Sequence, residues 1–140
     1  MVNKKSRKRR SLRRKHRNQN VNSDSLCIMH TNIRGFKSKC LSLNLMLSGV
    51  DILTINETRL NKNENMKIQG FKPFLRNRPN AQGGGVATCV RLRDYQSSLK
   101  VYESVGDNEF IITKHSQFSP AINILNFYGP QECRTIGDPA

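Results

Sequence analysis

The sequence predicts a domain of the α/β class that follows a basic N-terminal arm. Near the start of the domain, two strand-like apolar segments flank one helix-like segment, and this order predicts a parallel β–α–β unit. Four further strand-like segments, separated by polar turns, predict a mainly antiparallel second half. A chain of 140 residues is long enough for one hydrophobic core, which we assign to residues 25–140, after an arm and linker at 1–24.

The arm concentrates positive charge. Residues 1–17 contain ten of the 24 Lys and Arg residues and no Asp or Glu. The remaining 14 basic and 10 acidic residues give the rest of the chain a net charge of +4, out of +14 overall. Because like charges repel and few apolar side chains are present, we expect the arm to be disordered when free. Its basic residues are Lys4, Lys5, Arg7, Lys8, Arg9, Arg10, Arg13, Arg14, Lys15 and Arg17.

This composition predicts nucleic acid as the partner of the arm. Basic side chains that neutralise phosphates release condensed counterions, so the arm is suited to bind DNA without regard to sequence. No aromatic residue is interleaved with the basic ones, so the arm has no side chain suited to stack on bases. A signal read by a nuclear import receptor and a plain solvated tail both remain open as alternatives.

The remaining composition predicts a protein of the nucleus or cytoplasm. The four cysteines, Cys27, Cys40, Cys89 and Cys133, are too far apart to suggest a zinc site, and we treat them as reduced. No apolar run has the length needed to cross a bilayer, and polar residues rather than a signal-peptide core follow the basic arm. We therefore expect a chain that is neither secreted nor membrane-spanning, and no membrane partner.

The elements of the parallel unit follow the linker at 18–25. Residues 26–31 read as a buried strand that ends at Asn32, and Gly35 permits a tight turn after it. A helix is expected over 36–48, because its apolar residues recur near helical spacing. Residues 50–56 are β-branched and mostly apolar, as in a strand covered on both faces. The apolar helix residues are Phe36, Cys40, Leu43, Leu45 and Leu47, with Gly49 as the stop.

The second half is read from shorter segments. A short strand is expected over 70–75, followed by a surface loop rich in Pro, Asn and Gly. We interpret the three glycines at 83–85 as part of a hairpin turn rather than a phosphate cradle, because a strand follows them and not a helix. The four later strands are expected at 86–92, 101–105, 109–113 and 122–128.

Two of the predicted strands end next to residues suited to phosphate chemistry. Asn32 follows the first strand and Glu57 follows the second, and the carboxyl ends of parallel neighbours lie side by side. A carboxylate offers oxygen to a hard cation, and an amide can orient that carboxylate. By spacing alone, an acidic residue after a strand is more often a helix N-cap or a solvated loop charge than a metal ligand, so these alternatives stay open.

The ordered set of motifs resembles a known family. The segments are TNIRG at 31–35, DILTINETRL at 51–60, GF at 70–71, GGGVA at 83–87 and NFYGP at 126–130. Together they are similar to the first half of an endonuclease/exonuclease/phosphatase domain, particularly the apurinic-endonuclease-like domain of non-LTR retrotransposons. The resemblance implies a partial four-layer α/β sandwich, in which two mixed sheets are flanked by helices.

The same resemblance implies roles for single residues. Glu57 corresponds to the carboxylate that binds Mg²⁺, Asn32 to its neighbour in the active site, and Tyr128 to a hydroxyl that reaches the scissile phosphate. Gln131 falls where relatives often have an Asn that contacts this phosphate. Apart from the resemblance, four arginines are second-rank candidates for contacts to a nucleic-acid backbone, or else plain solvated charges: Arg76, Arg78, Arg91 and Arg93.

The resemblance also implies that the catalytic set is incomplete. The family's later Asp-x-Asn, a further Asp and a terminal Asp-His are absent from these 140 residues, and neither His30 in the first strand nor His115 in a predicted loop replaces them. We therefore expect a C-terminally truncated domain that is inactive alone, with an exposed edge and an uncovered apolar face. A non-catalytic nucleic-acid-binding remnant is the main alternative, and a phosphatase of the same superfamily is less favoured.

Overall fold

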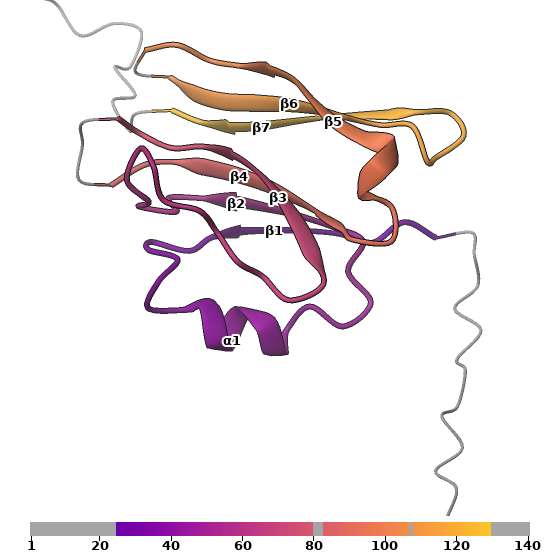
Figure 1. The fold of residues 1–140 in the computed structure, drawn as a ribbon, viewed down its shortest axis with the longest axis horizontal. Helices are drawn as coiled ribbons and strands as arrows, with labels where there is room; N and C mark the ends of the chain where they lie inside the picture. Colours follow the sequence, from indigo (N-terminus) through magenta and orange to yellow (C-terminus); the bar gives the residue numbers. More distant parts are fainter. Residues whose placement is uncertain (1–24, 80–82, 107, 130–140) are drawn as a thin grey trace, which may run out of the picture.

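A computed structural model describes residues 25–79, 83–106 and 108–129, which form two stacked sheets with one short helix (Figure 1). The arm residues, Gln131 and Cys133 lie outside these ranges. The elements are β1 (Ile28–Asn32), α1 (Cys40–Leu45), β2 (Ile52–Asn56), β3 (Phe71–Arg76), β4 (Val86–Arg91), the 3-10 turn η1 (Tyr95–Ser97), β5 (Ser98–Glu103), β6 (Glu109–His115) and β7 (Ile122–Tyr128). The four-stranded sheet, sheet A, has the order β1-β2-β4-β3, and the three-stranded sheet, sheet B, has the order β5-β6-β7.

Sheet A contains the predicted parallel pair. β1 runs parallel to β2, whereas β2 and β3 both run antiparallel to β4. The register pairs Asn32 with Asn56 at the carboxyl ends of β1 and β2. The chain therefore leaves both strands at the same edge of the sheet, which places the segments after Asn32 and Asn56 next to each other.

Two buried amides join sheet A to sheet B. Asn126 of β7 donates its side-chain N–H groups to the backbone oxygens of Ile55, at 3.2 Å, and Ala87, at 2.8 Å. Asn56 of β2 donates in return to the backbone oxygen of Phe127, at 3.1 Å. A buried amide needs such partners, so these bonds fix β7 against the carboxyl end of β2.

The main core lies between α1 and sheet A. Every residue of β2 is buried. Leu43 of α1 belongs to the same core cluster, together with Phe36 before the helix and Leu47 after it. Figure 1 shows the described layers in the order helix, sheet A and sheet B. The two sheets agree with a partial α/β sandwich: sheet A is mixed, and sheet B is antiparallel throughout the described residues.

The predicted helix is the least accurate element. Six residues from Cys40 to Leu45 are helical instead of thirteen, and Leu45 is 87% exposed rather than part of the buried stripe. Phe36 is withdrawn from the helix because its backbone N–H donates to the oxygen of Thr58, at 2.9 Å. Lys39 at the N-cap provides no side-chain hydrogen bond and neither terminal turn has a charge that suits the helix dipole, so little favours a longer helix.

Two strands of sheet B differ from the prediction in their bounds. β5 begins at Ser98 and β6 continues to His115, so the prediction that His115 lies in a loop is wrong. The imidazole is fully buried, with Nδ1 at 2.8 Å from the Ser98 hydroxyl and Nε2 at 2.9 Å from the Thr113 hydroxyl. Burial lowers the pKa of His115. Both ring nitrogens have partners, which allows a polar ring inside the sandwich.

The outer face of sheet B is apolar and exposed, as expected for a partial sandwich. Its aromatic row consists of Tyr102, Phe110 and Phe127. The ring centroids of Tyr102 and Phe110 lie 5.6 Å apart, and those of Phe110 and Phe127 lie 6.3 Å apart. Tyr102 and Phe127 are exposed, and so are Leu99 and Leu125. Within the described ranges no helix covers this face, and Figure 1 shows it open on the side away from sheet A.

The cysteines of the described residues are free and differ in burial. Cys27 is exposed, Cys40 is half-buried, and Cys89 on β4 is fully buried in the core. Burial raises the pKa of the Cys89 thiol to about 12, because an apolar environment disfavours the thiolate. In the part of the chain that the structure describes, no helix has the length and apolar character needed to cross a membrane.

Candidate active site at the carboxyl ends of β1, β2 and β7

Three of the predicted site residues meet at one end of the two sheets. The Asn32 side chain, at the end of β1, donates to Glu57 Oε1 at 2.8 Å. The Tyr128 hydroxyl, at the end of β7, donates to the same oxygen at 3.1 Å. Asn32 is 25 positions from Glu57 in the sequence and Tyr128 is 71 positions from it, yet both contact one carboxylate oxygen. The second oxygen, Oε2, accepts from neither of them.

The backbone around Glu57 adopts an uncommon conformation. Glu57 has a φ of 55°, Arg59 of 53° and Arg34 of 48°, all in the left-handed region that residues other than glycine seldom occupy. Each such residue costs on the order of 1 kcal/mol, and strained residues of this kind cluster at ligand sites. Neighbouring hydrogen bonds hold the loops in place: Gly35 N donates to Glu57 O at 2.8 Å, and Ile33 N donates to Asn56 O at 3.0 Å.

The glycine run at 83–85 holds the same loop from the other side. The backbone oxygen of Gly85 accepts from Thr58 N at 3.1 Å, and that of Gly84 accepts from Arg59 N at 2.8 Å. Both glycines have positive φ, and a Cβ on Gly85 would lie 2.3 Å from the Thr58 hydroxyl oxygen. The run thus connects β3 to β4, as a hairpin turn does, and its close approach also fixes the backbone that carries Glu57.

Sequence reasoning missed Glu109, which supports this arrangement from sheet B. Its carboxylate is fully buried and accepts from Arg78 Nε and from the backbone N–H of Gly85. Arg76 Nη1 lies 3.3 Å from the same carboxylate. An acid at the start of an apolar strand was the available sequence signal, although such a residue is more often a solvated turn charge.

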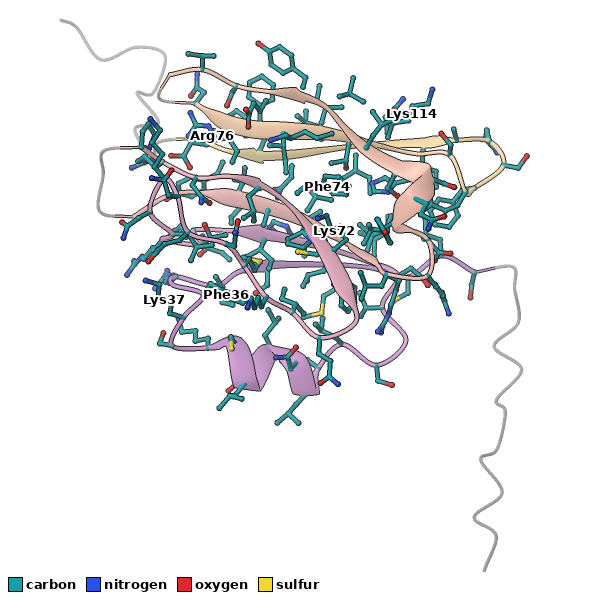
Figure 2. All side chains as sticks on the ribbon, viewed as in Figure 1. Phe36, Lys37, Lys72, Phe74, Arg76 and Lys114 are labelled. Carbon is teal, nitrogen blue, oxygen red and sulfur yellow. The ribbon has the colours of Figure 1, made fainter. Side chains whose placement is uncertain are left out.

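The prediction that Arg76 contacts nucleic acid is wrong, because this side chain lies inside the molecule. It donates to the backbone oxygens of Ser104, at 3.3 Å, and Gly106, at 2.6 Å, besides its ion pair with Glu109. Figure 2 shows Arg76 at the level between the two sheets. Arg78 is part-exposed and also pairs with Glu109, so the structure leaves its predicted role without a test.

Arg91 and Arg93 lie at the opposite end of sheet A from Glu57. Arg91 donates to the backbone oxygens of Val50, at 2.6 Å, and Leu47, and its guanidinium lies 4.3 Å from the centroid of the Phe71 ring. Arg93 pairs with Asp51 at 2.8 Å. An open cavity of about 1220 Å³ is found at that end, and none of the predicted catalytic residues lines it.

A smaller open pocket of about 420 Å³ lies at the Glu57 end, and four residues line it: Arg34, Glu57, Arg59 and Tyr128. Arg59 Nη2 is 3.5 Å from Glu57 Oε2, a distance at the limit of a hydrogen bond. The pocket therefore combines one carboxylate, one phenol and two guanidinium groups. Sequence analysis did not single out Arg34 or Arg59, because arginines in turns carry no signature of their function.

The hydrogen bonds at Glu57 set the protonation states of the site. The Asn32 amide is the largest cause of a lowered pKa at the Glu57 carboxyl group, with smaller contributions from Tyr128, Arg59 and Arg34, while desolvation opposes them. Desolvation and the Glu57 charge raise the pKa of Tyr128. At neutral pH the carboxylate is charged and the phenol keeps its proton. Because the folded pKa of Glu57 is depressed, its stabilisation is present above about pH 4.5 and is lost as the pH falls through the folded pKa.

The donor set in the described residues suits a hard cation only in part. An ionised carboxylate is the type of ligand that Mg²⁺ binds, and Glu57 Oε2 accepts from neither Asn32 nor Tyr128. No group of three or more His, Cys, Asp or Glu residues that could hold a metal occurs within 25–79, 83–106 and 108–129. The described part of the chain therefore supplies one carboxylate ligand at this site.

Comparison with known proteins gives a structural match only. No protein-family model and no curated protein matches the sequence. AP endonuclease LMAP from Leishmania major superposes with a TM-score of 0.55 at 17% identity, over 72% of this chain and 38% of that chain. A 3' phosphatase, NExo from Neisseria, bound to product DNA hairpin, superposes with a TM-score of 0.55 at 17% identity, over 74% of this chain and 41% of that chain.

The match concerns the architecture. Both proteins belong to the endonuclease/exonuclease/phosphatase superfamily, and the chain spans about two fifths of the length of each. Because the identity is this low, the match shows the fold alone: this chain shares the architecture of part of these two enzymes.

Proposed function

We propose that the chain is part of a Mg²⁺-dependent phosphodiester hydrolase that resembles a retrotransposon DNA endonuclease. One observation carries this proposal: Asn32 and Tyr128, from different sheets, donate to a single oxygen of Glu57. Two donors hold the carboxylate in one orientation and keep it ionised, so Oε2 is available as a ligand atom. A core tyrosine and two unrelated loop residues would have no reason to converge in this way.

In this proposal each residue has one task. Glu57 holds the cation, and Asn32 orients the Glu57 carboxylate. Tyr128 stays protonated, and when substrate binds its one O–H turns from Glu57 to donate a hydrogen bond to a phosphate oxygen. Bound Mg²⁺ would neutralise charge on the phosphodiester and polarise it for attack by water. The basic arm would add affinity for the DNA backbone without sequence preference, and Gln131, outside the described residues, would add a phosphate contact.

We expect a divalent cation to bind next to Glu57. Mn²⁺ is a paramagnetic substitute for Mg²⁺, and substoichiometric Mn²⁺ should broaden the NMR signals of the Asn32 side-chain amide and the Glu57 backbone amide. Glu57→Gln keeps the shape but removes the charge, so it should abolish the broadening. Glu103→Gln changes an exposed acid on β5 and should leave the broadening at Asn32 unchanged. Equal broadening in the wild type and in Glu57→Gln would rule out Glu57 as the ligand.

We expect these residues alone to show no metal-dependent nicking of supercoiled plasmid above background. Hydrolysis needs an activated water, and the two described histidines are engaged elsewhere, His30 with Thr54 at 2.8 Å and His115 with Ser98. The assay compares the chain with Mg²⁺, with EDTA, and with Glu57→Gln. Nicking that disappears both in EDTA and in the variant would show that the chain needs no further acid or base.

A non-catalytic nucleic-acid-binding role is the second candidate. The observation that favours it is the single carboxylate in the described part of the site, together with ten basic residues in the arm. Mn²⁺ binding at Glu57 separates the two candidates, because a purely nucleic-acid-binding role gives no reason for a cation there. A phosphatase of the same superfamily is less favoured, since the polybasic arm suits a DNA polymer better than a small headgroup. The arm could also be read by a nuclear import receptor, which fits a nuclear location.

A further inference from the structure

The pocket at Glu57 contains two arginines that the proposed roles leave unused. Arg34 belongs to the loop after β1, and Arg59 lies two residues after Glu57. Both side chains line the pocket of about 420 Å³ with Glu57 and Tyr128. Arg34 is exposed, and the Arg59 side chain is 51% exposed, so both guanidinium groups are accessible to a ligand in solution.

Arg34 differs from the other arginines in the described residues. Arg76, Arg78, Arg91 and Arg93 each have a carboxylate or backbone oxygen as a close partner of the guanidinium group. Within the described ranges, the Arg34 guanidinium has neither a hydrogen bond nor an ion pair, and Arg59 has only its 3.5 Å contact with Glu57. Among the arginines of the described residues, these two therefore have the most N–H groups left for a ligand.

The loops hold both arginines in place despite unfavourable backbone angles. Arg34 and Arg59 are in the left-handed region, which an arginine occupies only when its surroundings require it. Gly35 N donates to Glu57 O on one side, and Arg59 N donates to Gly84 O on the other, at 2.8 Å each. The two backbone positions are thereby fixed relative to Glu57, as expected where binding groups must be preorganised.

The charge of the pocket favours an anion. Two guanidinium groups and one carboxylate give a net charge of +1, and Oε1 of the carboxylate already accepts from Asn32 and Tyr128. Guanidinium groups bind phosphate oxygens in pairs of parallel hydrogen bonds, which a single ammonium group cannot reproduce.

We propose that Arg34 and Arg59 form a binding site for a phosphate group that does not require a bound metal. The choice of a phosphate ester as ligand rests on the proposed function. The site itself rests on two guanidinium groups in one pocket, of which Arg34 has no partner in the described residues and Arg59 has only the 3.5 Å contact with Glu57. In this arrangement the arginines hold the phosphate, and the Glu57 carboxylate lines the same pocket. Without a cation, the Glu57 carboxylate repels the phosphate.

The test uses the full chain, uniformly labelled with ¹⁵N, and inorganic phosphate as the probe. Phosphate is added in EDTA at constant ionic strength, with chloride as the balancing anion, and the arginine Nε–H signals are followed. We expect saturable shifts at Arg34 and Arg59 with one common affinity. Arg93, exposed but paired with Asp51 at the opposite end of sheet A, provides the control signal in the same spectrum. The arm also attracts phosphate, but residue-specific signals separate its contribution.

Two substitutions sharpen the test. Arg34→Asn removes the guanidinium group but suits the left-handed backbone, so the fold is kept and phosphate affinity at Arg59 should fall about tenfold, the loss of about one charge-assisted hydrogen bond. Glu57→Gln removes the repelling charge, so phosphate affinity without metal should rise several-fold. A site that binds phosphate only through a cation on Glu57 predicts the opposite result.

The outcomes also separate this inference from the proposed function. Saturable shifts at both arginines without Mn²⁺ binding at Glu57 would support the phosphate site and remove the metal role. Mn²⁺ binding without shifts at the arginines would remove the phosphate site and leave the metal role. Shifts that match those of Arg93, or an affinity that is unchanged in Arg34→Asn, would overturn the inference.

Discussion

Replacing Glu109 with Gln should lower the free energy of unfolding by about 3–5 kcal/mol, the usual effect of removing one partner of a buried ion pair. The substitution leaves the charges of Arg76 and Arg78 beside an uncharged amide in the interior. It also weakens the contact to Gly85 N, and thus the glycine run that holds the Thr58 and Arg59 backbone. Since small domains are stable by only about 5–15 kcal/mol, the loss is a large fraction of the total.

Urea denaturation followed by circular dichroism measures this change, with the midpoint and the slope both recorded. Glu103→Gln is the matched control, because Glu103 pairs with Lys100 at 2.9 Å on the exposed side of β5. An exposed pair contributes about 0–1 kcal/mol, so the control should be close to the wild type. Similar midpoints for the two variants would mean that Glu109 does not support the sandwich.

Deletion of residues 1–17 should have the largest effect on DNA binding. If each of the ten basic side chains contacts one phosphate, the arm contributes about −9 to the slope of log Kobs against log salt concentration. The deletion should therefore weaken binding to any duplex by about 10³-fold or more at low salt. It should also flatten the salt dependence.

Fluorescence anisotropy with a labelled duplex, at four or more salt concentrations, gives the affinity and the slope together. An arm with the same composition in shuffled order is the control, and it should bind like the wild type because the attraction depends on charge and not on sequence. Equal slopes with and without the arm would show that the domain, rather than the arm, provides the affinity.

The sequence predicted the part of the site that depends on strand ends. β7 was predicted at 122–128 and is observed as Ile122–Tyr128, and the β1–β2 pair is parallel as expected. Apolar strands bounded by polar residues mark their own ends, so the positions of Asn32 and Glu57 followed from local patterns. The hydrogen bonds of these two residues and Tyr128 agree with the predicted convergence, while their chemical roles stay predictions.

The features that the sequence did not predict depend on contacts between sheets. Arg76 and Glu109 are 33 positions apart, and both carry charges that normally indicate the surface. Only their mutual contact makes their burial favourable, and no local pattern encodes it. The short helix has a similar cause. The spacing of the apolar residues suits a helix from Phe36, but the backbone N–H of Phe36 donates to Thr58 O instead of to a helical partner.

Because Cys89 is buried, its reaction with a thiol reagent can be used to measure local unfolding of the core around β4. A thiol with a pKa of about 12 holds almost no thiolate at neutral pH, and its position in the core also keeps disulfide reagents out. Cys27 lies at the surface and has no such protection. In a labelling time course, the rate at which Cys89 reacts therefore measures how often β4 separates from its neighbours, while Cys27 records the reactivity of the reagent in the same sample.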